Sequence, residues 1–474
     1  MKYLDSIKQR LSALLPMWIL IMLVAIWSVV IQDGDINRDG LLYLKQAYLM
    51  ADGNWKEGLA LYPWPFFSIL IAILHKTSGL HLQVVAHAVD FALFGIAAWF
   101  YLKTLKLIYK HKHIIVYGGI ILLSFIPIMD DYVGMVLRDH GLWAGCMMGT
   151  YFYFKNIKKY FLKNSLMWQF GFLFAGLFRP EGLVFLILLP LWNLLQKKQQ
   201  IIKQLIQNFG LLILFGILCL IVILSSGFDI LSILSSSRLT EFGQRLIQFL
   251  MQLTQPLPLK SSNHWLSKLL EDYSLLITYS VLMTILLFKW IKGLSLLHGG
   301  LLFYHFIKPE NSNYQKHLYF FLIISFILVG VNLFNVYVLT NRYWGFHWWW
   351  VFILIAPKLL SLLESKKTFI LIKCSLIIFI LLLILNALID QPDNLERDIA
   401  KYIRDNNFTE INYGHNNRVY YYLNYQVSDL MKKSSGEGFK YKLIKIHDVN
   451  IIDTRLVIKN FPEQEPKFVL IKND

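Results

Sequence analysis

Acidic and basic side chains in this sequence gather at the ends of long apolar stretches, and the first of interest is Asp39. It opens the segment 39–55, in which Tyr43, Ala47 and Met50 fall near one face of a helix. The N-terminus of a helix favours a negative charge, and an ionised carboxylate is the state that a general base needs. Asp39 is therefore a candidate for taking a proton from a hydroxyl group.

Arginines and a second acid occupy similar places later in the chain. The short segments that hold them are Leu137-Arg138-Asp139-His140, Arg179-Pro180-Glu181-Gly182 and Arg342-Tyr343. A guanidinium group binds phosphate through two parallel hydrogen bonds. Arg138, Arg179 and Arg342 therefore predict a phosphate site, with contacts to lipid headgroups as the alternative.

The remaining acids and metal-ligand types give weaker signals. Asp33 and Asp35 are typical of helix caps or solvated loops. Asp130 and Asp131 have the same interpretation, although together with Asp139 they could hold a divalent cation. The 13 histidines lack the spacing of a metal site, and the three cysteines lie in apolar stretches as small hydrophobic residues.

Asp90 stands inside an apolar stretch, three residues after His87. Helical spacing would place both side chains on one face. Such a pair could pack one helix against another, or it could belong to a proton path within the membrane. The sequence leaves both interpretations open.

The composition is that of a membrane protein. Hydrophobic residues make up 56% of the 474 residues, against about 45–50% in soluble domains. Residues 11–31 carry no charge, are long enough to cross a bilayer and lack the cleavage site of a signal peptide. The net charge of +16 comes largely from lysines placed directly after apolar stretches, a pattern that reports orientation rather than nucleic-acid binding.

This charge pattern predicts an all-α polytopic membrane domain over residues 1–390, with about eleven transmembrane helices and a cytoplasmic N-terminus. We expect residues 65–74 to form a helix on the outer surface, 294–307 a surface or re-entrant helix, and 227–272 a long outer loop. Residues 391–474 are more charged, with helical spacing at 394–405 and alternation at 410–413, 441–446 and 467–471. They predict a small α/β domain outside the membrane.

The order of these motifs resembles that of the GT-C glycosyltransferases that use polyprenyl-phosphate sugars, such as protein O-mannosyltransferases and lipid A aminoarabinose transferases. Those enzymes carry an acid pair after the first span, followed by two surface helices. Asp39 matches the first acid, Gly53-Asn54-Trp55 the end of the first surface helix, and Pro63-Trp64-Pro65 the start of the second. Gly40 stands where the family has its second acid. The resemblance covers roughly residues 12–390.

The resemblance implies roles for the candidate residues. The catalytic acids would be Asp39, as the general base, and Asp139. The donor phosphate would be bound by Arg138, Arg179 and Arg342. Substrate would be contacted by Tyr43, Glu181 and Tyr343.

The implied reaction is an inverting transfer of a sugar from a polyprenyl phosphate to a hydroxyl group of a glycan, lipid or protein. It would take place on the outer face of a cell-envelope membrane, such as a bacterial inner membrane, without a cofactor other than the divalent cation considered above. The sequence has no glycine-rich phosphate loop, which argues against a nucleotide-sugar donor. A lipid or polysaccharide translocase and an outer-face glycan polymerase or ligase are the alternatives. A translocase would place binding groups near the membrane midplane, whereas the polar groups here lie at one side.

Overall fold

The computed structural model describes most of the N-terminal region, the helices between 273 and 406, and short strands near the C-terminus. The described ranges are 13–31, 36–62, 64–159, 161–196, 273–310, 314–336, 339–365, 370–389, 395–406, 411–412, 441–445, 457–461 and 468–472, with isolated residues between 208 and 251 and at 419. Asp33, Asp35, Pro63 and nearly all of the predicted outer loop 227–272 lie outside these ranges.

The chain divides into two compact units. Unit 1 comprises Met1–Val29, Asp90–Gly134 and Arg138–Asp390, and unit 2 comprises Val30–Val89, Met135–Leu137 and Gln391–Asp474. Unit 2 thus includes both residues 30–89 and residues 391–474, and the division into domains 1–390 and 391–474 stays a prediction.

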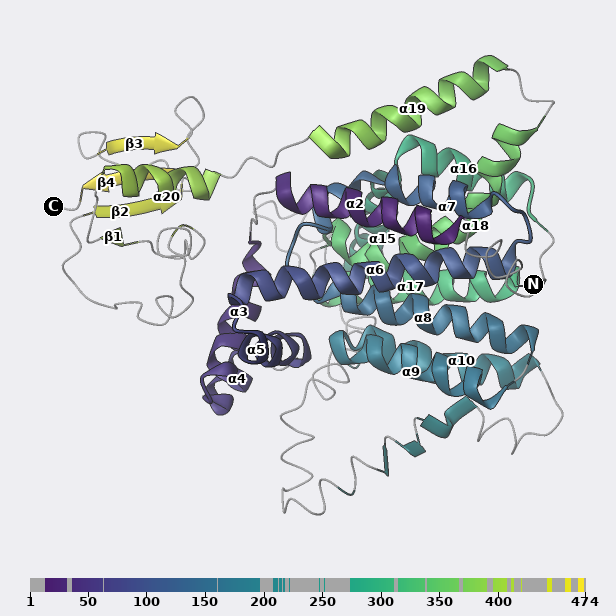
Figure 1. Ribbon diagram of the computed structural model, residues 1–474, viewed down its shortest axis with the longest axis horizontal. Helices are drawn as coiled ribbons and strands as arrows, with labels where there is room; N and C mark the ends of the chain where they lie inside the picture. The colour runs from purple at the N-terminus through teal and green to yellow at the C-terminus, as the bar shows by residue number, and fades with distance from the viewer. Residues whose placement is uncertain are drawn as a thin grey trace, which may run out of the picture. The chain divides into compact units, whose positions relative to one another are not determined.

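Unit 1 is helical (Figure 1). Its elements, with α2 and α6 extending into unit 2, are α2 (Leu14–Ile31), α6 (Leu82–Ile108), α7 (Ile114–Leu123), the π-helix η1 (Pro127–Tyr132), α8 (Asp139–Lys158), α9 (Leu162–Phe178), α10 (Glu181–Gln196), α15 (Ser274–Gly293), α16 (Leu296–Ile307), α17 (Gln315–Val336), the 3₁₀-helix η2 (Asn341–Trp344), α18 (Gly345–Glu364) and α19 (Ile370–Ile389).

Several of these helices have the properties of membrane spans. Within the described ranges, three are long and apolar enough to cross a bilayer: Leu82–Ile108, Gln315–Phe334 and Asn341–Glu364. Tyr279–Gly293 and Leu296–Ile307 would make a fourth if they form one broken span, since the chain bends by 107° between them. Such a bend occurs in a broken span and in a re-entrant loop alike, so the surface or re-entrant helix at 294–307 stays a prediction.

Small residues bring α8 and α9 into close contact. A Cβ atom at Gly145 would lie 2.4 Å from the backbone nitrogen of Ala175, and one at Gly171 would lie 2.4 Å from that of Gly149. Backbones approach this closely only where side chains are absent or small. Because the two helices form a hairpin, the first turn of α8 lies beside the last turn of α9.

Helix α18 fills the interior of unit 1. Its residues from Gly345 to Leu359 are all buried, and it packs against α7, α8, α16 and α17. The ring of Trp350 stacks on Phe321 of α17 at 5.2 Å, and its indole donates a hydrogen bond to Thr150 of α8 at 3.0 Å. This packing fixes the preceding helix η2, which carries Arg342.

Unit 2 begins with α3 (Arg38–Ala51), α4 (Trp55–Leu61) and α5 (Phe66–Ser78). Helix α3 ends before Gly53, whose positive φ of 91° suits glycine. The buried amide of Gln46 donates hydrogen bonds to the carbonyl groups of Gly58 and Tyr62, at 2.8 and 2.7 Å. Helices thus occur at both positions where surface helices are predicted, and α4 lies between them.

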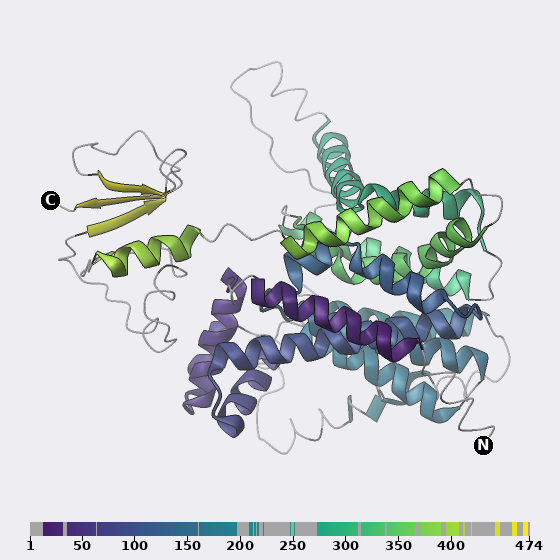
Figure 2. The same cartoon turned by 45° about the horizontal axis from the view of Figure 1, so that its top comes forward.

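The C-terminal segment of unit 2 contains α20 (Leu395–Asp405) and the strands β1 (Ile411–Asn412), β2 (Tyr441–Lys445), β3 (Val457–Phe461) and β4 (Phe468–Lys472). The strand order is β1-β2-β4-β3, and only β1 and β2 pair in parallel. Figure 2 shows α20 alongside this sheet. Strand β3 was not predicted, because its residues do not alternate between polar and apolar. Its pairing with β4 is irregular between Val457 and Lys459.

Candidate functional site

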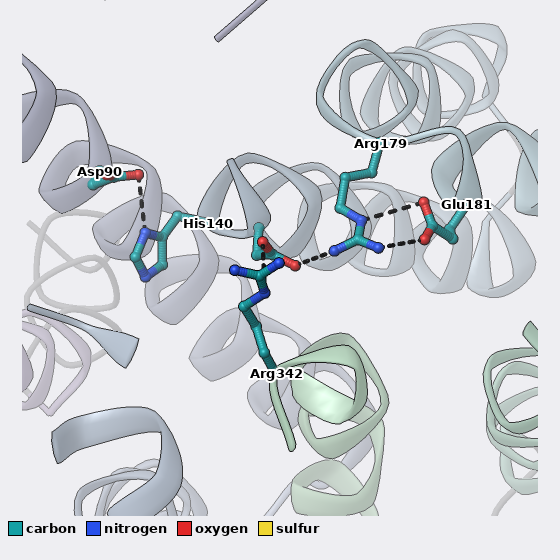
Figure 3. Close-up of polar contacts among 6 residues, drawn as sticks. Asp90, His140, Arg179, Glu181 and Arg342 are labelled. Atoms are coloured by element: carbon teal, nitrogen blue, oxygen red, sulfur yellow. Dashed lines mark hydrogen bonds and ion pairs between the residues drawn. The ribbon is translucent and has the colours of Figure 1, made fainter. Parts of the chain in front are cut away.

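Side chains from three separate places in the sequence meet at one carboxylate in unit 1 (Figure 3). Asp139 begins α8, Arg179 follows the last residue of α9, and Arg342 belongs to η2. Oδ1 of Asp139 accepts a hydrogen bond from Nη1 of Arg179 at 2.5 Å, and its Oδ2 lies 3.8 Å from Nε of Arg342. We call Asp139, Arg179, Glu181, Arg342 and Tyr343 the arginine cluster.

Glu181 holds Arg179 from a second side. Nε and Nη2 of Arg179 donate to the two oxygens of Glu181 at 3.3 and 2.6 Å. Carboxylates therefore occupy three of the five N–H groups of this guanidinium. The side chain of Arg179 is 6% exposed, whereas that of Arg342 is 21% exposed. Glu181, predicted as a substrate contact, thus orients Arg179, and Arg342 is the more accessible arginine.

The ring of Tyr343 lies beside both arginines. The guanidinium carbons of Arg179 and Arg342 are 5.2 and 5.7 Å from its centroid. An aromatic face attracts cations, which lowers the cost of bringing two like charges together. Tyr343, also predicted as a substrate contact, is thus placed to position the two guanidinium groups.

The charges of the cluster control the ionisation of Asp139. Burial raises the pKa of its carboxyl group, but the nearby guanidinium charges, of which Arg179 and Arg342 act most strongly, lower the pKa overall to about 2. Such a carboxylate accepts a proton poorly at neutral pH. The predicted catalytic role of Asp139 is accordingly better described as that of a counter-ion, which the half-buried Arg138 beside it also approaches.

The same contacts bear on the divalent cation. Asp130 and Asp131 lie in η1, and no group of three or more histidine, cysteine, aspartate or glutamate side chains in the described ranges is arranged to hold a metal ion. One oxygen of Asp139 already accepts a short hydrogen bond from Arg179. The described residues therefore give no support to a cation site built on Asp139.

Asp39 lies in unit 2, as the second residue of α3, where its side chain is half-buried. The adjacent Gly40 is tightly packed: a Cβ atom there would lie 2.7 Å from Oδ1 of Asn37 and 3.0 Å from Cβ of Val136. A second acid at position 40 would not fit without rearrangement. The close packing at Gly40 thus leaves no room for the second acid of the pair that the resemblance would require.

Tyr43 does not face solvent, contrary to its predicted role as a substrate contact. Its side chain is 4% exposed. Its ring meets those of Tyr62 and Phe67 edge to face, at 5.9 and 5.4 Å. These contacts pack α3 against α5, so Tyr43 serves the interior of the helical cluster.

Asp90 and His140 form a second buried polar pair, next to the arginine cluster. His140 was not among the residues predicted from the sequence. Nδ1 of His140 lies 2.9 Å from Oδ1 of Asp90, and both side chains are almost fully buried (Figure 3). Asp90 thus bonds across from α6 to α8, in addition to sharing a helix with His87. The signal that could have revealed His140 is its place directly after Asp139.

Comparison of the chain with models of protein families gave no match, and comparison with curated proteins gave none either.

Proposed function

We propose that this protein is an inverting glycosyltransferase of the GT-C type, which moves a sugar from a polyprenyl-phosphate donor to a hydroxyl acceptor. The arginine cluster is the observation that carries the proposal. It joins two guanidinium groups, one tyrosine ring and two carboxylates at the ends of apolar helices. Cationic groups next to apolar helices suit a ligand with a phosphate head and a hydrocarbon tail.

The chemistry follows from the residue types. The bond between the anomeric carbon and the phosphate oxygen breaks, and its electron pair stays on the phosphate. The acceptor oxygen attacks that carbon from the opposite side and loses its proton, so the configuration inverts. Guanidinium groups stabilise the charge that develops on the leaving phosphate.

The two arginines contribute differently to phosphate binding. Arg179 is hydrogen-bonded to Asp139 and Glu181, at 2.5 and 2.6 Å. Arg342 is more exposed, and its distance to Asp139 is longer, at 3.8 Å. The greater exposure of Arg342 makes it the more accessible of the two to a phosphate. The resemblance assigns the proton of the acceptor to Asp39, and the buried pair of Asp90 and His140 offers a second candidate for it.

The proposal includes the arrangement in the membrane: about eleven transmembrane helices, the N-terminus in the cytoplasm, and residues 391–474 on the outer side. A reporter that is active only outside the membrane should work when fused after Asp474. Activity of a cytoplasm-only reporter at that position would contradict the arrangement.

Purified full-length protein tests the reaction directly. It is mixed with a labelled polyprenyl-phosphate sugar and with glycan, lipid or peptide acceptors that carry hydroxyl groups. Transfer of the label with inversion at the anomeric carbon is expected, and a nucleotide sugar should give none. Movement of intact labelled lipid across vesicles without transfer would contradict the proposal and favour a translocase.

A further inference from the structure

Two buried polar atoms on adjacent rings in unit 1 have no hydrogen-bond partner among the described residues. They are Nε2 of His140 and Nε1 of Trp143. Both side chains are completely buried, and their ring centroids lie 5.0 Å apart with the planes at 87°. Buried polar atoms are normally paired, so orphaned atoms on two neighbouring rings call for an explanation.

The two orphaned atoms are of opposite type. A carboxylate oxygen accepts hydrogen bonds, so the contact with Asp90 places a proton on Nδ1 of His140, and the imidazole ring then carries a lone pair on Nε2. The indole nitrogen of Trp143 only donates. An acceptor and a donor on neighbouring rings are complementary to a hydroxyl group, which donates one hydrogen bond and accepts others.

The surroundings keep this place apolar. The ring of Phe94 meets His140 edge to face at 6.3 Å, and the ring of Trp349 lies 6.1 Å from Trp143. Aromatic walls lower the local polarity, which strengthens a hydrogen bond or a proton transfer made between them. The pair also lies close to the arginine cluster in the chain, because His140 directly follows Asp139 in the first turn of α8.

We propose that His140 and Trp143 bind the acceptor hydroxyl group, and that Nε2 of His140 takes its proton during sugar transfer. The inference rests on the proposed function and names the proton acceptor of that reaction. The O–H bond breaks and leaves its electron pair on the attacking oxygen, while an N–H bond forms at Nε2. Asp90 acts as a positioning residue that sets the tautomer and stabilises the imidazolium, as the aspartate does in a Ser-His-Asp triad.

Kinetics of the full-length protein test this role. His140→Gln retains polar atoms but cannot accept the proton, and we expect turnover to fall by about 10²–10⁴-fold with little change in the KM of the donor. Trp143→Phe keeps an aromatic ring without the N–H group and should lose about tenfold. His298→Gln is the matched control, because His298 is equally buried but bonded at both ring nitrogens, to Ser295 and to the carbonyl of Ile121.

The tautomer of His140 provides a readout that does not depend on transfer. In protein labelled with ¹⁵N-histidine, the signal that disappears in His140→Gln should show a protonated Nδ1 and a bare Nε2. Asp90→Leu, which has no hydrogen-bond acceptor, should release the proton from Nδ1 and reduce turnover. An unchanged tautomer together with unchanged turnover in this variant would contradict the positioning role of Asp90.

The outcomes separate this inference from the proposed function. Turnover of His140→Gln within about twofold of wild type would overturn the role of His140 and would mean that the orphaned atoms bind only a structural water. A protonated Nε2 together with a bare Nδ1 would also overturn it. Failure of the wild-type protein to transfer sugar would overturn the proposed function. The tautomer would then still decide whether Nε2 can accept a proton.

Discussion

Asp39 and Asp139 occupy the same kind of position, in the first turn of a helix, yet their surroundings differ. Asp139 is buried, bonded to Arg179 and approached by Arg342. Asp39 is half-buried, at the start of an amphipathic helix, beside a glycine that leaves no room for a second acid. The position of an acid in the sequence identifies it as a candidate for catalysis. The charges around it in the fold set its pKa, and therefore decide whether it can take up a proton.

The largest expected effect separates the two acids by their chemistry. Asp39→Asn keeps the size and much of the hydrogen bonding of the side chain but cannot accept a proton. With Asp39 as the base, which the resemblance implies, turnover should fall by about 10²–10⁴-fold while the donor still binds; with His140 as the base, Asp39→Asn should keep most of its turnover. Steady-state transfer rates measure this, with Asp33→Asn and Asp35→Asn as controls that should change little.

The inference that His140 of α8 takes the proton is decided by the two variants together. Normal turnover in Asp39→Asn together with a strong loss in His140→Gln would assign the proton to His140. Full activity in both variants would contradict the glycosyl-transfer mechanism.

The next effect separates the two acids by stability. Asp139→Asn leaves the buried charge of Arg179 with Glu181 but without its closest partner, and breaking a buried pair destabilises a protein by about 3–5 kcal/mol. Asp39→Asn should change stability much less. Thermal unfolding followed by tryptophan fluorescence compares the variants, and equal midpoints would show that the arginine cluster does not stabilise unit 1.

A smaller effect concerns the dependence of folding stability on acidic pH. Folding lowers the pKa of Asp139 from 3.8 to about 2. Its ionisation therefore stabilises the folded protein fully at a pH above the unfolded-state pKa. This stabilisation is lost as the pH falls through the folded-state pKa. The contribution is on the order of 2 kcal/mol. The stability difference between wild type and Asp139→Asn should therefore shrink between about pH 4 and pH 2. A difference that stays constant over that range would contradict the depressed pKa.

Much of the local structure could be predicted from the sequence. The Arg179-Pro180 tip between α9 and α10 follows from two apolar stretches around a short polar segment, and α3 follows from its helical period and Gly53. Local patterns of this kind depend on residues close in the chain, which is why periodicity and turn residues reveal them.

The assembly of the site could not be predicted in the same way. Asp139 meets Arg179 and Arg342 only because α8 packs on α9 through glycines and because α18 is buried between helices. The bond between Asp90 and His140 spans 50 residues, whereas helical period offered only His87. Helical spacing identified the face of α3 that carries Tyr43 but could not show that this face is buried in the fold.

The affinity of the protein for a labelled polyprenyl phosphate in detergent micelles tests the central claim most directly. Arg342→Ala should weaken binding by about 10–100-fold, because it removes hydrogen bonds between charged groups. Asp39→Asn and Arg404→Ala, an exposed arginine of α20, should bind as wild type does. If Arg342→Ala and Arg179→Ala both retained wild-type affinity, the arginine cluster would not be a phosphate site, and the proposed glycosyl transfer from a polyprenyl phosphate would be contradicted.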